Sequence, residues 1–333
     1  MDDWLRSHLV CPRDRGPLDL TGAQLVCENG HLYPVFDGIP VMLVDDAVST
    51  HGYLDETLEQ VSLNIDGEAK RQLRPIGDNR HGVDAFVQGE VPYTSGSLYF
   101  AIQHKLTRYP IPKLPLPRAE GTRFLDIGCN WGRWSIAAAR SGYRPVGIDP
   151  SLDAVLAARR VCDQLGVRAD FVVADARFLP FADRSFSVVY SYGVFQHLSK
   201  ANARLGITEL RRVLDCGGRS LVQMPNRRGV RQYQQHRRRG FTEGEGFEVR
   251  YWIPSELLVT FQQLVGPSTI SADCFFGLGV QASDGDLFPF RYRMLVRASQ
   301  SLKFASRWCR PLRLRADSLF VESIQSSNSE VLL

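Results

Sequence analysis

A glycine-containing loop with an acidic residue before it lies near the middle of the chain and could bind a nucleotide-type ligand. The loop runs Asp126-Ile-Gly-Cys-Asn-Trp-Gly132, between an apolar run and a pattern of small residues with helical spacing. This order predicts a strand, a tight turn and a helix. Glycines at 128 and 132 remove the Cβ atoms that would keep a ligand from the backbone, and the following helix directs free N–H groups toward it.

The spacing of the loop separates two kinds of ligand. A dinucleotide fingerprint needs G-x-G-x-x-G, whereas Asn130 stands where the second glycine would be, which argues against a bound pyrophosphate. The D-x-G-x-x-x-G arrangement resembles motif I of the class I S-adenosylmethionine-dependent methyltransferases, whose ligand carries no phosphate. The resemblance implies S-adenosylmethionine as cofactor, held in this stretch by Asp126, Gly128, Cys129, Asn130, Trp131 and Gly132.

Two more acidic residues end the next two apolar runs. Asp149 follows the run 145–148, and Asp175 follows the run 171–174. An acid in the first of these places can accept hydrogen bonds from both ribose hydroxyls. The methyltransferase resemblance implies that Asp175 and its neighbour read the adenine edge, whereas a nicotinamide coenzyme gives no reason for Asp175. It adds five residues to the cofactor site: Asp149, Pro150, Asp175, Ala176 and Ser191.

The segment 192–198 faces the reactive methyl group in the family that the chain resembles. Methyl transfer is an in-line displacement at carbon, so the protein mainly aligns the acceptor and excludes water. A hydroxyl acceptor benefits from a base, and His197 is the one histidine of seven expected on this face. Tyr192 is the second catalytic candidate. The alternative is that His197 only packs against or caps the next helix. The segment lacks the Asn/Asp-Pro-Pro-aromatic sequence of enzymes that methylate exocyclic base amines.

Six arginines lie between positions 227 and 239. Guanidinium groups bind phosphate or carboxylate through paired hydrogen bonds. Arg237, Arg238 and Arg239 are therefore candidates for binding a phosphorylated sugar, a lipid-linked glycan or an RNA backbone. The alternative is a solvated loop that the acidic residues at 243–248 partly neutralise.

Residues 9–43 contain short β-type runs separated by Asp-Gly, Asn-Gly and Pro turns. The stretch from Tyr33 to Leu43 resembles the end of the zinc-ribbon-like activator module of tRNA methyltransferases, which also occurs fused to some bacterial methyltransferases. That module has C-x-x-C twice, whereas here Asp and Gly replace the second cysteine of each pair. Cys11, Asp14, Cys27 and His31 could still bind zinc. The alternative is that the metal has been lost and apolar packing holds the module.

The patterns divide the chain into a β-rich module (1–48), a helical and Pro-rich linker or cap (49–118), a methyltransferase domain (119–324) and a flexible tail (325–333). The predicted fold is α/β, with a Rossmann-like sheet of seven strands, mostly parallel, whose last strand is antiparallel. In the linker we expect helices over 55–71 and 95–109, a loop over 77–82 and an extended run over 109–117, where prolines prevent a helix. Later elements are a turn at Cys216, strands over 268–276 and 317–323, and a basic helix over 290–307.

Composition excludes several classes of protein. The 333 residues are 44% hydrophobic, but no run approaches the 18 apolar residues of a membrane span, and the start lacks the order of a secretion signal. Seven scattered cysteines do not form a disulfide framework, so we expect reduced thiols and a cytoplasmic location. The net charge of +4 is too small to indicate nucleic acid by itself.

The leading functional prediction is an O-methyltransferase that uses S-adenosylmethionine on a small metabolite or glycan precursor, anionic in character. One alternative is a tRNA or rRNA methyltransferase that grips RNA with the arginine-rich segment and the N-terminal module. A second is a non-catalytic partner subunit that has kept the cofactor site. The identity of the acceptor and the oligomeric state stay open at this point.

Overall fold

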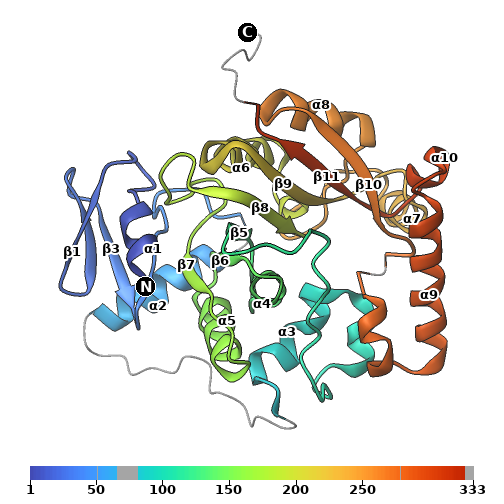
Figure 1. Cartoon of the computed structure of the whole chain (residues 1–333), viewed down its shortest axis with the longest axis horizontal. Coiled ribbons are helices and arrows are strands. Elements are labelled where there is room, and N and C mark those ends of the chain that lie inside the picture. Colours follow the sequence, from blue (N-terminus) through green and yellow to red (C-terminus); the bar gives the residue numbers. More distant parts are fainter. Residues whose placement is uncertain (51, 66–81, 278, 327–333) are drawn as a thin grey trace.

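A computed structural model describes residues 1–50, 52–65, 82–277 and 279–326. Within these ranges the chain forms a four-stranded and a seven-stranded sheet with helices around them (Figure 1). The small sheet and helix α9 lie at opposite ends of the long axis of the molecule. None of the described helices combines the length and the apolar character needed to cross a bilayer.

The N-terminal module is a short helix and an antiparallel meander. Its elements are α1 (Asp3–His8), β1 (Leu18–Thr21), β2 (Gln24–Cys27), β3 (Leu32–Phe36) and β4 (Ile39–Pro40), and the strands pair in chain order. Asp37 and Gly38 both have positive φ, at 49° and 78°. An Asp-Gly pair suits such a turn because both residues tolerate this conformation, so the sequence closes the β3–β4 hairpin locally.

The module packs against the edge strand of the large sheet and shares its core. Met42 N donates to Val173 O at 2.7 Å, and Val10 N donates to Pro180 O at 3.1 Å. Buried side chains of the module, including Leu5, Leu25 and Met42, belong to the same apolar cluster as the strands of the large sheet. The module is therefore not a loosely tethered appendage in this structure.

The large sheet confirms the predicted α/β architecture. Its strand order is β10-β11-β9-β8-β5-β6-β7. Strands β5, β6, β7, β8 and β9 are mutually parallel, and β11 is antiparallel to both of its neighbours. The strands span β5 Arg123–Ile127, β6 Arg144–Asp149, β7 Asp170–Val173, β8 Phe186–Tyr192, β9 Leu214–Pro225, β10 Ser268–Cys274 and β11 Ser318–Ile324.

Successive side chains of β5 point to opposite faces of the sheet. Leu125 and Ile127 pack in one cluster with residues of α6 and α8, and Phe124 packs on the other face with residues of α4. The helices of this part span α4 Arg133–Arg140, α5 Leu152–Gln164, η3 Phe195–His197, α6 Lys200–Val213, α7 Val230–Arg238, α8 Pro254–Leu264, η4 Ala282–Leu287, α9 Phe290–Ala305 and α10 Arg310–Arg313. Both faces are covered, as a parallel sheet requires.

The linker between the two sheets is helical but differs from the sequence prediction. The structure has α2 (Tyr53–Ile65), α3 (Ala85–Ser95) and a 3₁₀ helix η2 (Ser97–Ile102), instead of one helix over 95–109. Gly96, with φ of 119°, breaks the helical path between α3 and η2. Residues 109–117 form neither helix nor strand, as predicted. The expected helix beyond residue 65, most of the loop 77–82 and most of the tail 325–333 lie outside the described residues.

The later elements match their predicted positions closely. Strands β10 and β11 and helix α9 end within a few residues of the predicted bounds. Cys216 lies inside β9 instead of in a turn before it, because β9 begins at Leu214 and is irregular there. Its pairing with β8 shifts register, from Phe186 opposite Leu214 to Val188 opposite Arg219. The residues between, which include the two glycines, form a bulge.

Candidate active site

A cavity of about 550 Å³ opens at the carboxyl ends of β5, β6, β7 and β8. This volume lies within the range of small-molecule sites, and the carboxyl ends of parallel strands are where α/β sheets bind ligands. The cap also contributes to the wall: Leu54 of α2, Phe86 and Tyr93 of α3, and Gly96 line the cavity. A ligand would therefore lie between the sheet and the cap.

The glycine loop after β5 forms one wall. Gly128 N and Cys129 N both donate to Ile148 O at 2.8 Å, which ties the loop to β6. Gly128 has φ of 74°, and a Cβ there would lie 2.1 Å from Cγ2 of Val194. Both the backbone conformation and the neighbouring side chain therefore require glycine.

Replacing Gly128 by alanine is expected to destabilise the protein by about 2–4 kcal/mol, since it combines a left-handed residue with a clash against a branched side chain. The matched control is Gly166→Ala, because Gly166 also has positive φ but faces open space. Gly166→Ala should destabilise the protein by only about 1 kcal/mol, the cost of a side chain at a residue with positive φ. Denaturant unfolding of the two variants measures the difference, and equal losses would contradict the close approach of Val194.

Asp149 is the central acid of the cavity. Its Oδ2 accepts from Asn130 N and its Oδ1 accepts from Ser151 N, both at 3.0 Å. Burial raises the pKa of this carboxyl to about 6. Two backbone N–H groups fix its orientation, and each oxygen keeps one lone pair for a ligand in the cavity that it lines.

Asp175 also lines the cavity, but it forms an ion pair with Arg177. Arg177 Nη2 lies 2.6 Å from Asp175 Oδ2, and Arg177 N donates to Asp175 Oδ1 at 2.8 Å. The same guanidinium donates to Val48 O at 3.0 Å. The carboxylate is thus held in place by an ion pair, and its remaining lone pairs are fewer than the adenine-reading prediction assumed.

The structure brings together seven of the residues predicted to bind the cofactor. Gly128, Cys129, Asn130, Asp149, Pro150, Asp175 and Ala176 all line the cavity. Four others lie outside its lining: Asp126, Trp131, Gly132 and Ser191. Asp126 accepts from Ser135 Oγ at 2.7 Å beneath the loop, and Ser191 Oγ donates to Ile127 O at 3.1 Å. Asp126 thus joins β5 to α4, and Ser191 joins β8 to β5.

His197, at the end of η3, also lines the cavity. Its ring stacks on Phe247 with centroids 3.9 Å apart, and its Nδ1 lies 2.7 Å from Phe247 O. Because a carbonyl oxygen only accepts, Nδ1 carries the proton. Nε2 is then the acceptor nitrogen, 3.0 Å from the amide nitrogen of Gln196. A neutral imidazole held in this tautomer can take a proton from a neighbouring hydroxyl.

Tyr192, the other catalytic candidate, is suited to a different task. Its hydroxyl donates to Asp273 Oδ2 at 2.9 Å. Burial, reinforced by the negative charge of Asp273, raises the pKa of this phenol well above its ordinary value. Tyr192 therefore stays protonated at neutral pH and shapes the cavity wall, where it lies between Trp134 and Phe320, without serving as a base.

The three arginines predicted to bind substrate do not line the cavity. Arg237 and Arg238 are exposed at the end of α7. Arg239 lies 3.3 Å from Glu248 Oε2 and donates to Val249 O at 2.9 Å. The charge of Arg239 is thus partly neutralised by the acidic segment, as the alternative interpretation expected.

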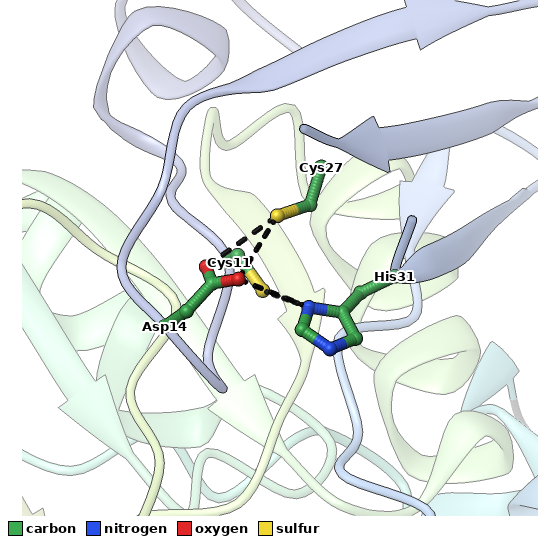
Figure 2. A group of neighbouring side chains, drawn as sticks. All are labelled: Cys11, Asp14, Cys27 and His31. Carbon is green, nitrogen blue, oxygen red and sulfur yellow. Dashed lines mark hydrogen bonds and ion pairs between the residues drawn. The ribbon is translucent and has the colours of Figure 1, made fainter. Parts of the chain in front are cut away.

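The four candidate zinc ligands of the N-terminal module converge (Figure 2). The ligand atoms of Cys11, Asp14, Cys27 and His31 all lie within 4.8 Å of one another. Cys11 Sγ is 3.4 Å from His31 Nδ1, and Cys27 Sγ is 3.2 Å from Asp14 Oδ2. Tetrahedral zinc with these ligand types has neighbouring ligand atoms about 3.3–3.8 Å apart. The residues therefore fit a structural zinc ion that would join the first turn of the module to the β2–β3 turn.

Purified protein is expected to contain about one zinc ion per chain, as a closed four-ligand site does. Cys11→Ser and Cys27→Ser should lose it, whereas Cys216→Ser should not, because that thiol is exposed on β9. Elemental analysis after zinc loading measures the content. Wild-type protein that stays metal-free after loading, yet folded, would show that packing alone holds the module.

The seven-stranded order, the glycine loop after β5 and the acid at the end of β6 define a Rossmann-like protein with a nucleoside-type site. Residues 124–218 match the family described as "Methyltransferase domain", and residues 7–38 match "Trm112p-like protein". The chain contains a class I S-adenosylmethionine-dependent methyltransferase domain and carries a Trm112p-like module at its N-terminus.

Relatives match the two parts separately. An Agrobacterium fabrum ubiquinone biosynthesis O-methyltransferase is 35% identical over 116 residues, which are 35% of this chain and 45% of that protein. The chain thus spans less than half the length of this curated relative. A UPF0434 protein of Vesicomyosocius okutanii is 46% identical over 48 residues, 14% of this chain and 81% of that protein. A solved Haloferax volcanii complex containing the Trm112 methyltransferase activator is 20% identical with a TM-score of 0.43, covering 64% of this chain and 86% of that one.

Proposed function

We propose that the chain is an S-adenosylmethionine-dependent O-methyltransferase acting on a small metabolite or glycan precursor. The observation that carries the proposal is one cavity whose lining includes Asp149 and the glycine loop together with Gln196 and His197. The first two suit a nucleoside, and His197 offers a base for a hydroxyl group. The ubiquinone biosynthesis O-methyltransferases among the relatives support an oxygen acceptor.

The side chains divide the work of such a transfer. When bound, S-adenosylmethionine supplies an electrophilic methyl carbon on its sulfonium. Asp149 and Asp175 would orient the nucleoside, while the walls from α2 and α3 exclude water. His197 Nε2 would accept the proton of the acceptor hydroxyl as its oxygen bonds to the methyl carbon and the carbon–sulfur bond breaks, with S-adenosylhomocysteine as the leaving group. Phe247 O, bonded to Nδ1, keeps the imidazole in the required tautomer.

A transfer screen with the labelled methyl group tests the proposal. Hydroxylated small molecules, sugar nucleotides and RNA are offered separately, and the labelled product is analysed for the acceptor atom. We expect an O-methylated small product. Label that enters only RNA would favour the RNA methyltransferase instead, although the exposed Arg237 and Arg238 lie outside the cavity and give that alternative little support.

We also propose domain boundaries near residues 48, 118 and 324, a zinc-ribbon-like N-terminal module and a cytoplasmic location. The convergence of Cys11, Asp14, Cys27 and His31 supports the metal. The seven cysteines are free thiols, which suits a reducing compartment.

A further inference from the structure

A segment near the C-terminus carries the whole excess of positive charge of the chain. Residues 287–316 contain eight Lys and Arg residues and no Asp or Glu: Arg291, Arg293, Arg297, Lys303, Arg307, Arg310, Arg313 and Arg315. The other 303 residues contain 32 Lys and Arg against 36 Asp and Glu, so they are net negative. Charge of one sign gathered in one segment favours an anionic partner.

Most of this segment forms α9, which packs against β10 with one side. Val296 and Ser299 are buried on this inner side of the helix. Ser299 Oγ accepts from Phe275 N at 3.0 Å and donates to Phe275 O at 3.1 Å, just past the end of β10. Figure 1 shows α9 at the end of the long axis opposite to the small sheet. The packing thus fixes which side of α9 faces away from the body of the protein.

The outer side of α9 exposes a line of large apolar side chains. Phe290, Met294 and Phe304 follow the helical period, and Trp308 continues the line just after the helix ends at Ala305. Their exposed fractions are 67%, 46%, 56% and 72%. From the first to the third of them the helix rises about 20 Å. Single exposed apolar residues are common on soluble proteins, but a row of this length marks an interaction surface.

Arginine side chains lie beside this apolar line. The guanidinium of Arg293 lies 5.9 Å from the ring centroid of Phe290, and that of Arg307 lies 5.4 Å from that of Phe304. Among the residues that the structure describes, no carboxylate forms an ion pair with the exposed arginines of α9 and the turn after it, which are Arg291, Arg293, Arg297 and Arg307. The surface therefore combines exposed apolar groups with cations that lack an acidic partner in this part of the chain.

We propose that the outer side of α9, from Phe290 to Trp308, binds the surface of a bilayer that contains anionic phospholipids. The aromatic rings and Met294 would enter the boundary between headgroups and acyl chains, while the arginines beside them meet the lipid phosphates. An RNA backbone would also attract the arginines. However, RNA gives no reason for the exposure of Met294 and Leu295, at 46% and 44%, because bases stack on aromatic rings. This attachment is independent of the proposed methyl acceptor.

Co-sedimentation of the full chain with large vesicles tests the electrostatic part. The vesicles consist of phosphatidylcholine alone, or of phosphatidylcholine and phosphatidylglycerol in equal amounts. We expect binding to the anionic vesicles, and this binding should weaken as salt is added. The triple variant Arg291→Gln, Arg293→Gln, Arg297→Gln should bind them roughly 100-fold more weakly, because each basic residue near an anionic surface adds to the affinity. A control variant that removes the same charge at exposed positions outside the segment should bind like wild type: Arg118→Gln, Arg140→Gln, Arg168→Gln.

Trp308 tests the apolar part directly, because it is the one exposed tryptophan of the five in the chain. Phosphatidylcholine with brominated acyl chains should quench its fluorescence in anionic vesicles, and Trp308→Phe should lose this quenching. The double variant Phe304→Ser, Trp308→Ser should bind at least about 10-fold more weakly. Its control is Leu205→Ser, Val259→Ser, which removes two exposed apolar side chains from α6 and α8.

Three results would overturn the proposal. One is equal binding of wild type to neutral and anionic vesicles, or no binding to either. Another is vesicle binding by the α9 variants that equals that of their controls, or vesicle binding without quenching of Trp308. The third is binding of a labelled single-stranded RNA that the arginine variant loses, with no binding to vesicles, which would assign the surface to RNA. All substituted side chains are exposed, so unfolding midpoints should match wild type; if the serine variant unfolds early, the arginine variant and the quenching still decide.

Discussion

Replacing His197 by alanine is expected to lower the turnover of the methyl transfer by roughly 10²- to 10⁴-fold, the usual contribution of a positioned base. The imidazole lines the cavity, its Nδ1 donates to Phe247 O, and its Nε2 accepts from the Gln196 amide, which the acceptor hydroxyl would replace. His197→Gln keeps a polar side chain of similar length but has no basic nitrogen, so it should be nearly as slow. The measurement is single-turnover transfer of labelled methyl to the acceptor that the screen identifies.

The affinity for S-adenosylhomocysteine separates a catalytic from a structural effect of these changes. It should be unchanged in both His197 variants, because the proposed role of the imidazole is to take a proton from the acceptor and not to bind the cofactor. His8→Ala is a suitable control, since His8 is bonded within α1 to Trp4 O. Normal turnover in His197→Ala would show that His197 is not the general base. A parallel loss of cofactor affinity would indicate that the histidine only holds the wall of the cavity together.

Replacing Asp149 by asparagine is expected to weaken S-adenosylhomocysteine binding by roughly 100-fold or more, because hydrogen bonds to a charged acceptor contribute about 1.5–3 kcal/mol each. The carboxylate accepts from two backbone N–H groups, of Asn130 and Ser151. An asparagine amide offers only one oxygen, so one of these N–H groups loses its partner as well as the ligand. Asp163→Asn, on the exposed face of α5, is the matched control and should bind normally.

The same carboxyl predicts how binding depends on pH. Burial raises the pKa of Asp149 to about 6 in the ligand-free protein. A ligand that donates hydrogen bonds prefers the ionised form, so affinity should rise as the pH increases through about 6 and fall below it. Calorimetry between pH 5 and 8 measures this slope. Asp149→Asn should lack that contribution, and an identical pH dependence in wild type and variant would assign the titration to another group.

The positions of the strands and of the ligand loop could be predicted from the sequence because they depend on local signals. Apolar runs that end in Asp149 and Asp175 mark the carboxyl ends of parallel strands, and these residues do line the cavity. Asp126 shows the limit of this reasoning. Side chains alternate along a strand, and the parity of β5 directs Asp126 toward α4 and Ser135. The motif gave its place in the chain but not the face on which it lies.

The linker could not be predicted in detail because its structure depends on tertiary contacts. The apolar spacing after residue 95 has a helical period, yet those side chains pack around a 3₁₀ turn that starts after Gly96. Tyr99, for example, is buried by its contact with Phe288, far away in the sequence. Helix α3 was missed altogether, since Pro92 within it is a signal against a helix.

Arg133 and Arg177 were missed for a similar reason. Each stands in a stretch that was interpreted through its glycines or acids, and only the fold shows that both guanidinium groups are buried beside the cavity. One signal was present in the sequence. An arginine at the start of a helix whose next turn is apolar or small has no local acid to pair with it, so it predicts a distant partner, which for Arg133 is Thr94 O at 3.3 Å.

Calorimetric titration of the purified protein with S-adenosylhomocysteine tests the central claim most directly, since the claim is that this cavity holds an adenosyl ligand. We expect one site per chain with a dissociation constant of about 1–100 μM, within the usual range for enzyme ligands. Asp149→Asn should abolish the signal at the same concentrations, and Asp163→Asn should retain it. A folded wild-type protein that shows no binding, or that binds a nicotinamide dinucleotide instead, would contradict the claim.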